Sequence, residues 1–142
     1  MTDASNAAPE KHGQRTWLLR TSLLVLYSVA VLYFGTSRNG VVTSDNVLTS
    51  DKMLHGLVFG GLGVLTYRAS AAALPQRTRR FHAGLGILWA AALGGLLEGI
   101  QATLSYRSAE FLDFVADLVG AAVLVAIATA LRAERSLPSG TS

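Results

Sequence analysis

Residues 111–131 read FLDFVADLVGAAVLVAIATAL, and apart from Asp113 and Asp117 every residue in the run is apolar or small. A helix of this length covers the roughly 30 Å of hydrocarbon in a bilayer. Because lipid offers no hydrogen-bond partner to free backbone groups, a run this apolar is expected to be helical. The stretch therefore predicts a transmembrane helix that carries two carboxylates near its start.

Three similar runs precede it, at residues 17–34, 53–74 and 81–104. Of the 142 residues, 51% are hydrophobic and only 15% are charged. We therefore predict an all-α, polytopic protein of the cell (inner) membrane, with a compact bundle of four transmembrane helices over residues 17–131. The flanking segments, 1–16 and 132–142, are polar and are expected to be disordered tails.

The distribution of basic residues predicts the orientation of the bundle. Lysine and arginine gather before the first run, between the second and third, and after the fourth. By the positive-inside rule, both termini and the middle loop are expected in the cytoplasm, with loops 35–52 and 105–110 outside. This bias also accounts for the net charge of +3, and no nucleic-acid module is present. The absence of cysteine excludes disulfides and thiolate ligands.

Small residues recur at a spacing of four, which places them on one face of a helix. Such pairs let helix backbones approach closely inside lipid, where packing drives association. We therefore expect helix contacts at three pairs: Gly56 and Gly60, Gly95 and Gly99, and Ala116 and Gly120.

The ionisable residues of the predicted spans converge near the outer surface. An ionisable side chain inside a span is costly, so it marks a functional site or a paired structural role. Helical phase places those of each helix on one stripe, and the three stripes are expected to face one another around an interior pocket. The candidate residues are Asp51, Lys52 and His55 on the second helix, Glu98 and Gln101 on the third, and Arg107, Glu110, Asp113 and Asp117 around the start of the fourth.

The charges of this cluster do not balance. Five carboxylates (Asp51, Glu98, Glu110, Asp113 and Asp117) meet two fixed cations and one titratable histidine. Five buried like charges cannot all stay ionised without partners, so some are protonated, or a cation binds, or several reach water. Histidine with carboxylates is compatible with a divalent cation, and a protonated Glu98 would serve as a general acid.

Several of these residues also admit a structural role. Asp51 would serve as the N-cap of the second helix, and Ser108 as that of the fourth, with Glu110 near its positive end. Arg107 would pair with Glu110 or Asp113 and hold the bundle together.

Depth distinguishes the remaining ionisable residues. His55, Glu98 and Asp117 lie deeper in the predicted spans, and for them we favour a functional role. His12 and His82 fall in a tail and at a cytoplasmic helix end, where they are expected to be solvated or interfacial.

At these residues the sequence resembles the VanZ-like family of small membrane proteins. Residues 51–55, DKMLH, resemble its D-K-x-x-H, and residues 98–101, EGIQ, resemble its E-x-x-Q. Residues 107–113, RSAEFLD, continuing to Asp117 and Gly120, are similar to its R-x-x-[DE]-x-x-D-x-x-x-N-x-x-G. Asp117 stands where the family more often has Asn, and Ala109 replaces a usual aromatic residue. The resemblance implies a bundle of four to five helices in the cell membrane and a link to teicoplanin resistance.

Three functions are compatible with this pattern. The first is a non-enzymatic resistance or envelope factor, in which the outer cluster binds a lipid-linked cell-wall precursor or a lipid headgroup. The second is a membrane enzyme acting on a lipid-linked envelope substrate, with Glu98 or Asp113 as acid/base, His55 as base or metal ligand, and Arg107 as anchor for an anionic group. The third is a structural or partner bundle held together by its charges. The lipid bilayer is a partner in all three, and the pattern makes no prediction of oligomeric state.

Overall fold

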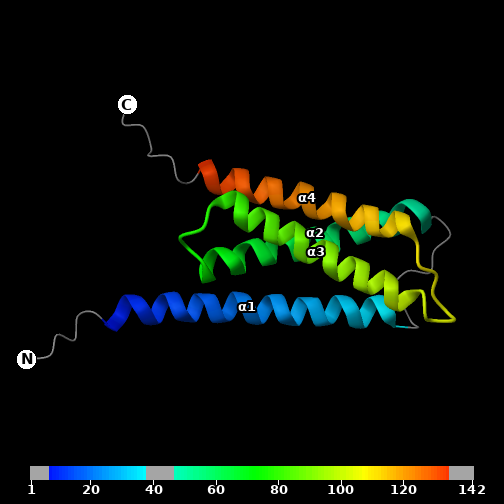
Figure 1. The fold of residues 1–142 in the computed structure, drawn as a ribbon, viewed down its shortest axis with the longest axis horizontal. Helices are drawn as coiled ribbons and strands as arrows, with labels where there is room; N and C mark the ends of the chain where they lie inside the picture. Colours follow the sequence, from blue (N-terminus) through cyan, green and yellow to red (C-terminus); the bar gives the residue numbers. More distant parts are fainter. Residues whose placement is uncertain (1–6, 38–46, 135–142) are drawn as a thin grey trace, which may run out of the picture.

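The computed structural model describes residues 7–37 and 47–134, and within them the chain forms four helices and no strand. These are α1 (Ala7–Thr36), α2 (Val47–Ala73), α3 (Arg79–Gln101) and α4 (Phe111–Glu134). Successive helices run in opposite directions, so that the described ends of the chain lie at the same end of the bundle (Figure 1). The predicted all-α class is confirmed.

The first helix begins earlier than the sequence pattern predicts. It starts at Ala7, whereas the apolar run starts at Trp17, so residues 7–16 are helical although they were expected to belong to a disordered tail. The remaining parts of the two expected tails, residues 1–6 and 135–142, lie outside the described residues.

Three helices of the described chain contain segments long and apolar enough to cross a bilayer: Gly13–Thr36, Arg79–Gln101 and Phe111–Ala133. Their outward surfaces carry large apolar side chains. On α1, for example, Leu19, Leu26 and Tyr33 are 66%, 67% and 66% exposed. Extensive exposed apolar surface of this kind is unsuited to water but matches lipid. These features indicate a membrane protein.

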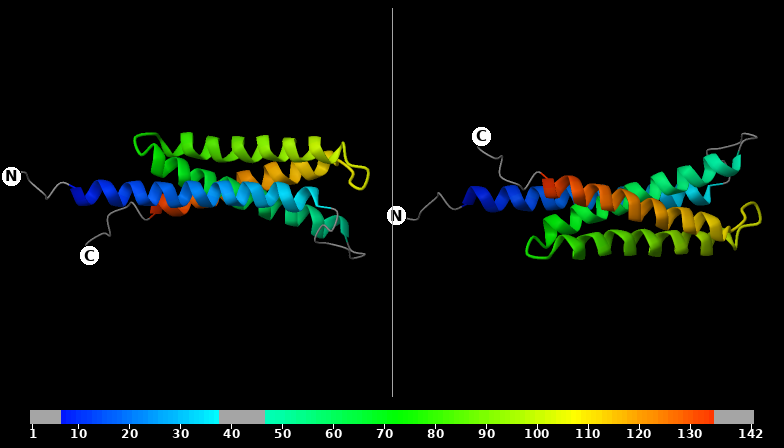
Figure 2. Two further views of the ribbon diagram at one scale, coloured as in Figure 1. Left: turned by 90° about the horizontal axis from the view of Figure 1, so that it is seen from below. Right: turned by 90° about the horizontal axis from the view of Figure 1, so that it is seen from above.

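The helix α2 is not among these three segments, and it is the central helix of the bundle. It packs against α1, α3 and α4, and the two further views show it running between them (Figure 2). Phe59 and Leu62 on α2 are almost completely buried. Small residues let a helix approach its neighbours closely on several sides. The glycines of α2 fit this position.

Glycine determines how closely α2 and α4 cross. A Cβ atom on Gly120 would overlap the backbone of Gly56, and one on Gly60 would lie 2.9 Å from the Gly120 carbonyl oxygen. The expected contacts at Gly56, Gly60 and Gly120 are confirmed. The expectation for Gly99 is wrong: among the described residues, nothing beyond its own helical backbone and chain neighbours lies within 4 Å of a Cβ placed there.

His82 is buried, contrary to the expectation that it is solvated or interfacial. Only 4% of it is exposed. The imidazole Nδ1 lies 3.1 Å from the Ser70 hydroxyl, and its ring meets Tyr67 edge to face. The short connection between α2 and α3 brings the first turn of α3 back onto the last turns of α2, and this covers the imidazole.

Candidate functional site

The nine candidate residues from the sequence gather at one end of the bundle, where α1 and α3 end and α2 and α4 begin. We call this the polar end. Three helices and the connection between α3 and α4 contribute to it: Asp51, Lys52 and His55 from α2, Glu98 and Gln101 from α3, Arg107 and Glu110 from the connection, and Asp113 and Asp117 from α4. Contacts among these residues link α2 to α4 and α3 to the start of α4.

Lys52 forms ion pairs with both carboxylates at the start of α4. Its Nζ lies 2.6 Å from Asp113 Oδ1 and 3.1 Å from Glu110 Oε2. The alternative that Arg107 pairs with Glu110 or Asp113 is wrong, since among the described residues both acids pair with Lys52 and the Arg107 guanidinium donates to the Ser37 carbonyl. Because Asp113 is only 6% exposed, this ion pair is largely withdrawn from solvent and ties the two helices together.

His55 and Asp117 form the deepest polar pair of the site. The imidazole Nδ1 lies 2.9 Å from Asp117 Oδ1, and its Nε2 lies 4.0 Å from Asp113 Oδ2. Asp117 is fully buried. Gly94 leaves the space for its carboxylate, because a Cβ at that position would come within 2.8 Å of Asp117 Oδ2. The ring of His55 is stacked nearly parallel to that of Phe59. The imidazole is thus held on one nitrogen and on one face.

Glu98 joins α3 to the start of α4. Its Oε2 accepts a hydrogen bond of 2.8 Å from the backbone N–H of Glu110, which immediately precedes the first residue of α4. Backbone N–H groups at a helix start need acceptors from outside the helix, and a carboxylate also suits the positive end of the helix. The acceptor at the start of α4 is thus Glu98, a side chain from a neighbouring helix, in place of the expected Ser108.

The N-cap interpretation of Asp51 is wrong, because α2 already begins at Val47 and Asp51 lies inside it. Its side chain instead lines a cavity.

Three side chains close the end of α1. Gln101 Nε2 donates to the Gly35 carbonyl at 2.9 Å, and the Tyr106 hydroxyl donates to the Thr36 carbonyl at 3.0 Å. Arg107 Nη2 donates to the Ser37 carbonyl at 3.1 Å. The last carbonyls of a helix have no partner within it, so these bonds satisfy groups that would otherwise remain unpaired. Sequence reasoning selected two of these donors but missed Tyr106.

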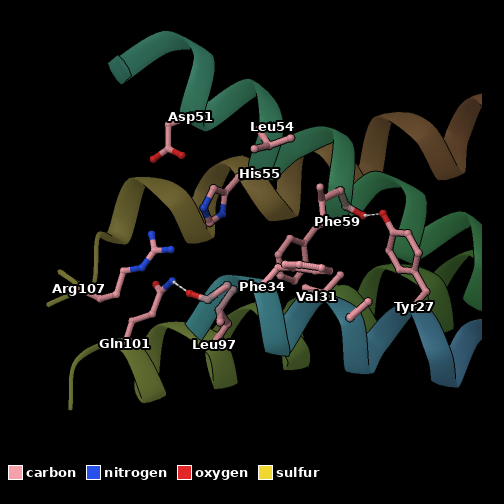
Figure 3. A pocket seen from close by; sticks show the side chains of 13 residues that line it. Tyr27, Val31, Phe34, Asp51, Leu54, His55, Phe59, Leu97, Gln101 and Arg107 are labelled. Atoms are coloured by element: carbon pink, nitrogen blue, oxygen red, sulfur yellow. Dashed lines mark hydrogen bonds between the residues drawn. The ribbon is translucent and has the colours of Figure 1, made fainter. Parts of the chain in front are cut away.

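A cavity of about 280 Å³ lies between α1, α2 and α3 at the polar end. It is polar on one side and apolar on the other. Figure 3 shows Asp51, His55, Gln101 and Arg107 around one part of it, and the apolar side chains extending away from them. The apolar part includes Val31, Phe34, Leu54, Phe59 and Leu97, with Tyr27 at its far side.

Three of the candidate residues are also arranged as possible metal ligands. One donor atom from each of Asp51, His55 and Asp113 lies within 4.8 Å of the other two. Asp51 and His55 also line the cavity. The residues of this group come from α2 and α4, the two helices that cross at Gly56 and Gly120.

Comparisons with protein families, with curated proteins and with solved structures give no match to this chain. The chemistry of the polar end therefore provides the basis for a functional proposal: an amphipathic cavity, a buried histidine–aspartate pair and an excess of carboxylates.

Proposed function

We propose that the protein is a VanZ-like, four-span protein of the cell (inner) membrane that binds a membrane-anchored amphiphile of the cell envelope. Its termini lie in the cytoplasm, and the polar end lies at the outer face. The observation that carries this proposal is the cavity, which combines apolar walls with a charged rim. The ligand class is a lipid-linked cell-wall precursor or a lipid headgroup.

The four-span topology is supported by helix length and by charge. The helix α2 has 27 residues, which corresponds to about 40 Å at a rise of 1.5 Å per residue and exceeds the hydrocarbon thickness. An even number of antiparallel spans places both chain ends on one side. The arginines in and around the α2–α3 connection and those flanking the termini favour the cytoplasm for that side.

The cavity is suited to a ligand with a charged head and an apolar chain. The Arg107 guanidinium at the rim would attract an anionic group, and Asp51 would attract a cationic one. Val31, Phe34 and Leu54 would contact a chain. Teicoplanin carries an acyl chain that anchors it in the membrane. A factor that occupies or alters the lipid surface would therefore affect teicoplanin more than vancomycin.

A second candidate is an enzyme acting on a lipid-linked envelope substrate. The observation that favours it is the pair formed by His55 and Asp117 at the cavity. A buried carboxylate that orients an imidazole beside a pocket is a common arrangement for general-base catalysis. This candidate predicts a changed lipid or precursor mass in cells that express the protein, whereas a binding factor leaves these masses unchanged.

The proposal is tested by drug susceptibility in a sensitive Gram-positive host. Ala30 lines the cavity, so Ala30→Leu would reduce its volume. Ala122 is exposed on α4, and Ala122→Leu is the matched control. We expect selective teicoplanin resistance with the wild type and Ala122→Leu, and its loss with Ala30→Leu at equal membrane abundance. Equal susceptibility of the wild type and the empty-vector strain, with the protein abundant and folded, would contradict the proposed role.

A further inference from the structure

We propose that Asp51, His55 and Asp113 bind one divalent transition-metal ion at the polar end. This inference concerns the same region as the proposed function but does not depend on the identity of the amphiphile, or on which side of the membrane the polar end faces.

The donor atoms are close enough to share an ion after small side-chain rotations. Donors about 2.1 Å from one tetrahedral ion lie about 3.4 Å apart. The donor atoms of the three residues lie within 4.8 Å of one another, so the widest pair needs to approach by at most about 1.4 Å. Asp51 and His55 are one helical turn apart on α2, and Asp113 faces them from α4. The bundle has therefore already brought the ligands together.

The hydrogen bond to Asp117 prepares His55 to act as a ligand. Asp117 Oδ1 lies 2.9 Å from Nδ1 and, in the neutral imidazole, favours the proton on that nitrogen, which leaves Nε2 with its lone pair. Metal-binding histidines usually donate their other ring N–H to a carboxylate or carbonyl in this way. Because Asp117 is fully buried, its carboxylate holds the ring in a fixed orientation.

Lys52 fixes the orientation of the Asp113 carboxylate. Its ammonium lies 2.6 Å from Oδ1, while Oδ2 is the oxygen 4.0 Å from His55 Nε2. With the imidazole proton on Nδ1, a nitrogen lone pair faces a carboxylate oxygen across this gap. Two electron-rich atoms in this arrangement attract a positive centre between them.

The surrounding charge also favours a cation. Among the nine residues of the polar end, five carboxylates are opposed by Lys52 and Arg107 as fixed cations. Asp117 Oδ2 and Glu98 Oε1 are buried and have no hydrogen-bond partner among the described residues. A divalent ion would reduce this excess of negative charge without adding a side chain.

The cavity gives the ion a position from which it would contact a ligand. Asp51 and His55 line the cavity, and Figure 3 shows both side chains beside it. Three protein ligands leave further coordination positions for water or for an anionic group in the cavity. One imidazole with two carboxylates suits Mn²⁺ or Zn²⁺ better than Ca²⁺ or Mg²⁺, which prefer oxygen ligands alone.

The test is metal binding by the full-length protein, purified in detergent micelles and treated with a chelator. Isothermal titration calorimetry with ZnCl₂ and, separately, with MnCl₂ is expected to show that at least one of the two metals binds with one ion per chain. His55→Gln and Asp113→Asn are each expected to weaken binding at least tenfold. Asp117→Asn is expected to weaken it by about 10- to 100-fold, as for other residues that orient a ligand. The control is Glu110→Gln, which removes a carboxylate bound to the same Lys52 but outside the ligand set.

Absence of saturable binding to the folded wild type would overturn the proposal. So would a loss in Glu110→Gln as large as that in Asp113→Asn, because it would reveal diffuse attraction to acidic groups. If His55→Gln does not fold, Asp51→Asn provides the same test from the cavity rim. Nitrogen NMR shows whether each ring nitrogen of His55 carries a proton. Protons on both nitrogens in the presence of saturating metal would exclude coordination by the imidazole and overturn the proposal.

The metal site and the proposed amphiphile site are tested independently. Ala30→Leu changes the cavity but none of the proposed ligands, so it is expected to keep the metal affinity of the wild type. A loss of metal binding in Ala30→Leu while the variant remains folded would overturn the ligand assignment.

Discussion

Asp117 Oδ1 lies 2.9 Å from His55 Nδ1, and this contact joins a completely buried carboxylate on α4 to an imidazole at the wall of the cavity. The second oxygen of Asp117 is tucked against Gly94 on α3. One side chain thus contacts two other helices, so the pair is expected to contribute to the stability of the bundle as well as to the chemistry of the polar end.

Asp117→Ala is therefore expected to destabilise the bundle strongly. Removing one partner from a buried pair typically costs about 3–5 kcal/mol, because the other partner stays buried without compensation. Glu110→Ala removes a carboxylate whose side chain is 50% exposed, and a loss of about 0–1 kcal/mol is expected. Thermal unfolding of both variants in the same detergent measures the difference. Similar losses for the two would mean that His55 and Asp117 do not form a stabilising pair.

The glycines of the bundle predict a second contrast. Gly120→Ala would drive a methyl group into the backbone of Gly56, so the variant is expected to separate α2 from α4 and lower the unfolding temperature markedly. Gly99→Ala meets open space among the described residues, and alanine is a better helix former by about 1 kcal/mol. Gly99→Ala is therefore expected to be neutral or stabilising. The reverse order of unfolding temperatures would contradict the observed crossing of α2 and α4.

The end of α1 depends on donors from the segment that follows α3. Gln101→Leu would leave the Gly35 carbonyl without its donor, at an expected cost of about 1–3 kcal/mol. The matched control is Thr103→Val, because the Thr103 hydroxyl bonds only locally, to the Ile100 carbonyl. Intrinsic fluorescence follows both variants on heating, since Trp17 lies on α1 and Trp89 on α3. An unchanged midpoint for Gln101→Leu would show that α1 is held by its apolar contacts alone.

Much of this arrangement is predictable from helical period and charge. Asp113 and Asp117 share one face of their helix, and His55 lies on the polar face of another. This pattern alone predicts that the polar side chains lie close together. The alternative in which Arg107 pairs with Glu110 or Asp113 is wrong, because Lys52 and Arg107 carry the same charge at similar depth and only the three-dimensional structure distinguishes them. Gly99 and Gly120 each follow a small residue four positions earlier, so the sequence does not distinguish them. In the structure, Gly99 faces open space and Gly120 faces a backbone.

Other features of the site had weaker signals in the sequence. Tyr106 and Gly94 act through contacts with a distant carbonyl and a distant carboxylate, and neither contact is encoded in local spacing. The apolar part of the cavity consists of ordinary core and lipid-facing residue types, so its existence follows only from how α1 packs against α2.

The orientation of the bundle provides the last prediction. The chain contains no cysteine, so single substitutions give unambiguous labelling sites. Ser108 lies between α3 and α4 at the polar end, and Arg77 lies between α2 and α3 at the opposite end; both are exposed. If the polar end faces outward, a membrane-impermeant maleimide is expected to label Ser108→Cys in intact cells. It would then label Arg77→Cys only after the membrane is opened, since the positive-inside bias keeps that loop in the cytoplasm. Labelling in the opposite order would place the cavity on the cytoplasmic side. A ligand at the outer face would then be excluded, while the metal site, which does not depend on the orientation of the bundle, would be unaffected.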